Sequence, residues 1–124
     1  MTGVASALSL ALTIAQAQPA DPIAATFRGW HVEVEDDRGG PDARVTDATT
    51  IGCVTTISAD KRSWAVDWSQ VDTIGLADVF IVLRGPGLQI AVVADVRDAA
   101  GVARLRGMRD AMMAAQGRCR RLVR

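Results

Sequence analysis

The sequence has few of the residues that commonly carry catalysis. It contains one histidine, His31, and only two cysteines, Cys53 and Cys119. A nucleophilic hydrolase needs a serine, cysteine or threonine beside an oriented base, which is usually a histidine. No G-x-S-x-G motif is present. These absences predict a protein that is not an enzyme and that binds no cofactor.

Long hydrophobic runs are also lacking. Residues 4–17 are uncharged and mostly apolar, but a membrane-spanning helix needs about 20 such residues. The run ends in Ala15-Gln16-Ala17, which has the small-x-small form that signal peptidase accepts, although Met1–Gly3 lacks the usual Lys or Arg. We expect residues 1–17 to be a signal peptide and residues 18–124 to be one domain, not an integral membrane protein. The alternatives are an Ala-rich helix packed on the domain and, third, an uncleaved anchor.

Export would explain the small number of cysteines. Both lie beyond the predicted cleavage site, and two cysteines in an oxidising compartment predict one disulfide, Cys53–Cys119. The predicted location is therefore the periplasm or the medium.

Charge is distributed unevenly along the chain. Residues 18–96 carry 6 basic and 12 acidic side chains, whereas residues 97–124 carry 8 arginines and 2 aspartates. The simplest interpretation is attraction between the two parts within one fold. A second is a site for an anionic partner, such as lipid head groups, and a third is a solvated, frayed tail. The anion-binding residues would be Arg118, Arg120, Arg121 and Arg124.

The middle of the chain has the alternating pattern of strands. Apolar alternation and β-branched residues predict strands in residues 27–35, 46–58 (one or two strands, with Gly52 as a bulge), 63–68, 71–74, 79–83 and 88–93. Residues 59–62 connect a hairpin, and the last two strands should lie centrally. One face is polar, which favours an antiparallel sheet. Trp30, Trp64 and Trp68 fall on the apolar faces and are expected in the core.

After Ala94 the apolar period changes from two residues to about 3.6, which predicts a helix capped by Asp95 or Asp98. Its buried stripe would contain Val102, Leu105, Met108, Met112, Ala115 and Cys119. The predicted fold class is therefore α+β: a mostly antiparallel sheet or partial barrel closed by one C-terminal helix.

Three polar residues on the first predicted strand could attract a metal ion. His31, Glu33 and Glu35 alternate along the strand, so their side chains would lie on one side, about 6–7 Å apart in succession. No zinc-type or calcium-loop spacing accompanies them. The competing interpretation is a solvated strand face.

The element order in residues 63–117 resembles the C-terminal half of bacterial pleckstrin-homology-like domains. Two apolar strands joined by a glycine-containing turn are followed by an acidic cap and a Leu/Met-striped helix. The resemblance implies a seven-stranded bent sheet or partial barrel and a binding or assembly module without catalysis. Phosphoinositide-binding members carry Lys and Arg in the first hairpin loop, whereas residues 35–42 here are mainly acidic. The helix also lacks the tryptophan of eukaryotic members, so no functional residue is transferred.

Together these patterns predict an exported, non-enzymatic binding or structural domain of the cell envelope. The alternative is an inhibitor or adaptor that binds an anionic partner through the basic C-terminal segment. The third is a metal-binding protein or enzyme that uses His31, Glu33 and Glu35. The expected partner is an envelope protein or an anionic surface, not a nucleic acid, and the oligomeric state stays open.

Overall fold

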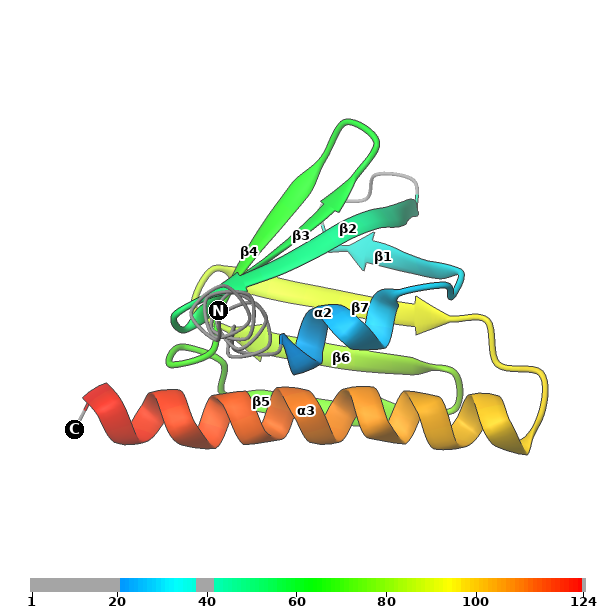
Figure 1. Cartoon of the computed structure of the whole chain (residues 1–124). Coiled ribbons are helices and arrows are strands. Elements are labelled where there is room, and N and C mark those ends of the chain that lie inside the picture. Colours follow the sequence, from blue (N-terminus) through cyan, green and yellow to red (C-terminus); the bar gives the residue numbers. More distant parts are fainter. Residues whose placement is uncertain (1–20, 38–41, 124) are drawn as a thin grey trace, which may run out of the picture.

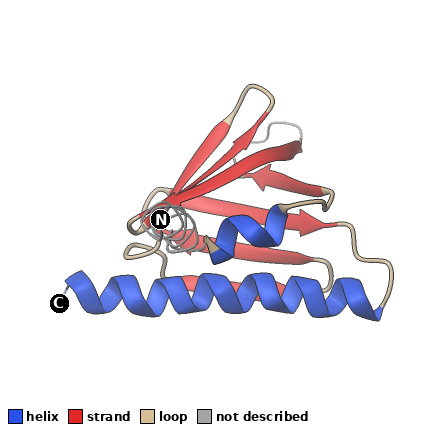
Figure 2. Ribbon diagram, viewed as in Figure 1, coloured by secondary structure: helices blue, strands red, loops and turns tan. Residues whose placement is uncertain are grey.

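The computed structural model describes residues 21–37 and 42–123 (Figures 1 and 2). The predicted signal peptide lies outside the described residues. In the described part the elements follow the order α2 (Pro22–Phe27), β1 (Val32–Asp36), β2 (Ala43–Ile51), β3 (Val54–Ala59), β4 (Ser63–Asp67), β5 (Thr73–Ala77), β6 (Phe80–Gly85), β7 (Leu88–Ala94) and α3 (Ala99–Val123).

The strands form one antiparallel sheet in the order β4-β3-β2-β1-β7-β6-β5. The sheet is not closed, since β4 and β5 are its two edges. Strands β2, β3 and β4 lean away from β5, β6 and β7, and α3 runs along the β5 side (Figure 1). The predicted α+β class, antiparallel sheet and C-terminal helix are confirmed. The last two predicted strands correspond to β6 and β7 and were expected at the centre of the sheet. The central strand is β1, and β7 and β6 follow it on one side.

The predicted strand over residues 27–35 begins too early, because Phe27 ends the short helix α2, residues 28–31 connect α2 to β1, and β1 starts at Val32. Asp21 caps this helix by accepting a hydrogen bond from the Ala24 N–H at 3.0 Å, and Pro22 occupies its first turn. Ile23, Ala24 and Phe27 are buried. In so short a segment, the spacing of apolar residues does not distinguish a helix from a strand. Tertiary packing decides which of the two forms.

Gly52 forms a turn and not the predicted bulge. Its φ is +62°, a left-handed conformation that glycine adopts without steric cost, and it allows β2 and β3 to pair as a hairpin. The bulge lies earlier in β2, between Val45 and Asp47. Residues 59–62 do connect a hairpin, closed by the Ala59 N–H donating to the Arg62 carbonyl at 2.8 Å.

The core lies between the sheet and the two helices. Alternate residues of the central strands are fully buried, including Val32 and Val34 of β1. The predicted stripe of α3 is buried from Leu105 to Cys119, whereas Val102 is 38% exposed because the first turn of α3 extends past the ends of β5 and β6 (Figure 1). Asp98 is the helix cap, since its carboxylate accepts the Gly101 N–H at 2.9 Å.

Within the described residues, we find no helix with both the length and the apolar character that a membrane crossing requires.

Candidate functional site

A disulfide joins Cys53 to Cys119, as predicted. Cys53 lies in the turn between β2 and β3, one residue before the strand on which it was expected, and Cys119 lies near the end of α3. Their Cα atoms are 5.8 Å apart, and Cys119 is fully buried. The bridge therefore fixes the C-terminal end of α3 against the β2–β3 turn.

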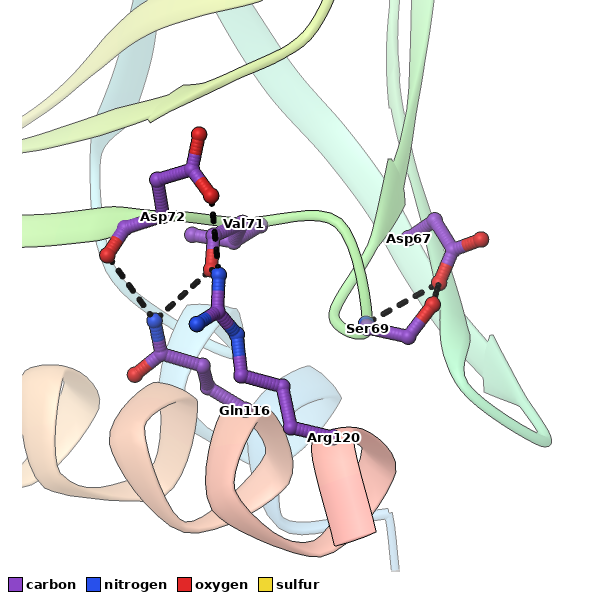
Figure 3. Close-up of polar contacts among 6 residues, drawn as sticks. All are labelled: Asp67, Ser69, Val71, Asp72, Gln116 and Arg120. Atoms are coloured by element: carbon purple, nitrogen blue, oxygen red, sulfur yellow. Dashed lines mark hydrogen bonds and ion pairs between the residues drawn. The ribbon is translucent and has the colours of Figure 1, made fainter. Parts of the chain in front are cut away.

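A polar contact holds the same end of α3 to the segment that precedes β5 (Figure 3). Gln116 Nε2 donates to the Val71 carbonyl at 2.8 Å. Arg120 donates to the same carbonyl at 2.7 Å and forms an ion pair with Asp72 at 2.9 Å. The bridge and this contact lie within one helical turn of each other, so this part of α3 has a fixed position.

The four predicted anion-binding arginines are not equivalent. Arg120 is held by Val71 and Asp72 and is poorly placed to bind a partner. Arg118 and Arg121 are exposed, and neither has a hydrogen-bond or ion-pair partner within the described residues. Arg124 lies outside the described residues. The expected attraction between the basic helix and the acidic body is present in the Arg120–Asp72 pair.

Arg118 lines a groove of about 460 Å³ beside the disulfide. The start of α2 forms one side of this groove, the β2–β3 turn forms a second, and α3 forms the third. Most of the lining is apolar or small: Pro22, Ile23, Gly52, Ala111, Ala114 and Ala115. The three alanines leave space that larger side chains on this face of α3 would fill.

Asp21 lies on the opposite side of the groove and connects α2 to β2. Its Oδ2 accepts the Thr50 N–H at 2.6 Å, while Oδ1 caps α2. Burial raises the pKa of the Asp21 carboxyl. The N–H groups of Ala24 and Thr50, the Thr50 hydroxyl and the charge of Arg28 lower it, and the net result is a pKa below the ordinary value of 3.8.

The lowered pKa predicts a pH-dependent contribution to stability. A carboxylate with a depressed folded-state pKa stabilises the protein above its unfolded pKa, and this contribution is lost as pH falls through the folded-state pKa. We expect Asp21→Asn to lower the free energy of unfolding by about 1 kcal/mol at neutral pH. The difference from the wild type should shrink between about pH 5 and about pH 2.

Urea denaturation across this pH range measures the effect. Asp60→Asn is the control, because Asp60 is exposed in the hairpin turn, and we expect it to change little. A deficit of Asp21→Asn that stayed constant with pH would contradict the role assigned to the charge.

The predicted metal-binding residues share the outer face of the sheet but do not form a ligand set. His31 Nε2 lies 3.4 Å from Glu33 Oε1, and both side chains are partly exposed, at 46% and 36%. Glu35 lies beside Asp42, whose charge raises the pKa of Glu35, with smaller contributions from burial and from Glu33. Among the described residues, no group of three His, Cys, Asp or Glu side chains is placed to hold a metal ion.

The tryptophans pack largely as predicted. Trp64 and Trp68 are buried, at 8% and 0% exposure. Trp30 is only half-buried, because it precedes β1 instead of lying within it. Its Nε1 donates to the Asp95 carbonyl at 2.9 Å, and the Arg104 guanidinium lies 4.8 Å from the centre of its ring.

Sequence patterns missed the groove because its lining comes from three separated segments. Asp21-Pro22 was the available indication, since an acidic residue before proline is typical of a helix start. Nothing local in the sequence indicates that α2 packs across from residues 111–118.

Comparison with protein-family models, with curated proteins and with solved structures finds no match to this chain. The functional argument therefore depends on the residues themselves.

Proposed function

We propose that this chain is an exported, non-enzymatic binding or structural domain of the cell envelope, located in the periplasm or the medium. The observation that carries the proposal is the Cys53–Cys119 disulfide. Disulfides persist in oxidising compartments and are rare where glutathione and thioredoxin keep thiols reduced. The apolar run that ends in Ala15-Gln16-Ala17 supports the same interpretation, because it has the form of a signal peptide.

The binding role is supported by the groove at the disulfide end. Small-molecule sites are concave, mostly apolar and contain a few polar groups, and this groove has that character. The seven strands followed by one long helix also support the pleckstrin-homology-like interpretation, in which such a domain binds or assembles.

Intact-mass analysis of the native protein, combined with cell fractionation, tests the proposal. We expect a chain that begins at Gln18, is recovered outside the cytoplasm, and resists alkylation at Cys53 and Cys119. The same sample after denaturation and reduction is the control and should alkylate at both cysteines. An unprocessed cytoplasmic chain that alkylates without reduction would overturn the proposal.

A second candidate function is an inhibitor or adaptor that binds an anionic partner. The observation that favours it is the exposure of Arg118 and Arg121, which lie within two residues of Cys119. Neither has a partner in the described part of the chain. No acidic residue lies between Ala111 and Val123. Such a segment attracts anionic surfaces at low salt.

A further inference from the structure

The groove between α2, the β2–β3 turn and α3 has an apolar floor, and the Arg118 guanidinium on its lining has no partner among the described residues. Ile23 and Ala115 form part of the floor and are 2% and 1% exposed. The volume of about 460 Å³ falls within the range of small-molecule sites, roughly 300–1,000 Å³.

The charges around the groove favour an anionic group only at the end formed by Arg118. Both oxygens of Asp21 accept backbone N–H groups, and Arg28 lies close enough for its charge to act on this carboxylate. Arg118 has no such partner within residues 21–37 and 42–123. Arg120 is bound to Val71 and Asp72. Within the described part of the chain, a ligand head group in the groove would therefore meet the uncompensated guanidinium of Arg118.

The volume of the groove favours a thin ligand over a partner helix. A helix with its side chains is about 10 Å across and rises 5.4 Å per turn, so one turn occupies about 400 Å³. The groove would hold about one turn, which offers little area to a helical partner. A hydrocarbon chain is thinner and can extend along the apolar floor.

We infer that this groove binds a free single-chain amphiphile with an anionic head group, of the fatty-acid type. The chain lies along Ile23 and the alanines of α3, and the carboxylate pairs with Arg118. This inference deepens the proposed binding function by naming a ligand class. It is tested separately from export, so a correctly processed, disulfide-bonded protein without this affinity would overturn the inference alone.

Titration calorimetry with octanoate and decanoate, below their micelle concentrations, is the primary experiment. It uses the disulfide-bonded chain as its own cells process it. Each buried methylene should tighten binding about fourfold, so decanoate should bind about fifteenfold more tightly than octanoate. Decyltrimethylammonium, which has the same chain length and the opposite charge, should bind much more weakly.

Two matched pairs of variants locate the site. Ala114→Trp fills the groove from an exposed position and should abolish decanoate binding, whereas Ala103→Trp, also exposed on α3 but outside the groove, should not. Arg118→Gln should weaken binding about tenfold, and Arg121→Gln should leave it unchanged. Circular dichroism of each variant checks that the fold is retained.

Decanoate binding that ignores Ala114→Trp, or no decanoate binding at all, would overturn the inference. Retention on anionic vesicles without affinity for free decanoate, reduced equally by Arg118→Gln and Arg121→Gln, would also overturn it. That last result would support the anionic-surface function in its place.

Discussion

Replacing Cys53 and Cys119 together by alanine is expected to lower the free energy of unfolding by about 4 kcal/mol. The two cysteines are 66 residues apart, so the bridge closes a long loop and restricts the unfolded chain strongly in the chain-entropy model. For a domain of this size, the loss corresponds to a fall in melting temperature of roughly 15–25 °C. Because small domains are stable by about 5–15 kcal/mol, the variant should be only marginally folded at 37 °C.

Thermal melts with and without reductant provide the control. Reduction of the wild type should produce a comparable fall, whereas the double-alanine variant should not respond to reductant. Single replacements separate the bridge from packing, since Cys119 is fully buried and Cys53 is only partly buried. Equal melting temperatures of the oxidised and reduced wild type would contradict a stabilising bridge.

The bridge shows why the fold was more predictable than the groove. Two local patterns indicate which residues face the core: the alternation of Trp64, Val66 and Trp68, and the helical period that ends at Cys119. Both patterns depend only on residues close together in the sequence. The disulfide needed only a count of cysteines and the two faces on which they lie. These signals give the fold class, the hairpin and the long helix.

The errors occur where local patterns compete with packing or turn geometry. The α2 segment is short, and its helix depends on the Asp21 cap and on burial of Ile23 and Phe27, which the strand pattern at residues 30–35 obscured. Gly52 adopts a positive φ in a turn. Glycine is equally typical of a β-bulge, so the residue type alone did not distinguish the two.

The candidate site was predicted only in part for a related reason. Four arginines near the C-terminus looked alike in sequence, and the structure distinguishes Arg120 from Arg118 and Arg121 through Val71 and Asp72, about 48 residues earlier. Helical spacing could have indicated the difference, because Gln116 and Arg120 lie four residues apart and point to one side. The partner segment could not be inferred from this spacing.

Trp68→Ala is expected to destabilise the protein by about 3–5 kcal/mol. The indole is fully buried, and its Nε1 donates to Thr55 Oγ1 at 2.8 Å. Thr55 is also fully buried, and its hydroxyl contacts the Thr50 hydroxyl at 2.7 Å. The substitution removes a large apolar volume and one partner of this buried pair. Urea denaturation measures the loss, and Trp30→Ala should cost less because Trp30 is half-buried.

Since Trp68→Ala removes enough stability to unfold a weak domain, a double-mutant cycle isolates the hydrogen bond. Trp68→Phe keeps most of the ring, and Thr55→Val keeps the shape of the side chain but leaves the indole N–H without its acceptor. Each single change should cost about 1–3 kcal/mol. The double variant should cost less than their sum by about 1 kcal/mol, because either change already breaks the bond. Strict additivity would mean that the bond contributes nothing, and that Trp68 stabilises the core through its apolar area alone.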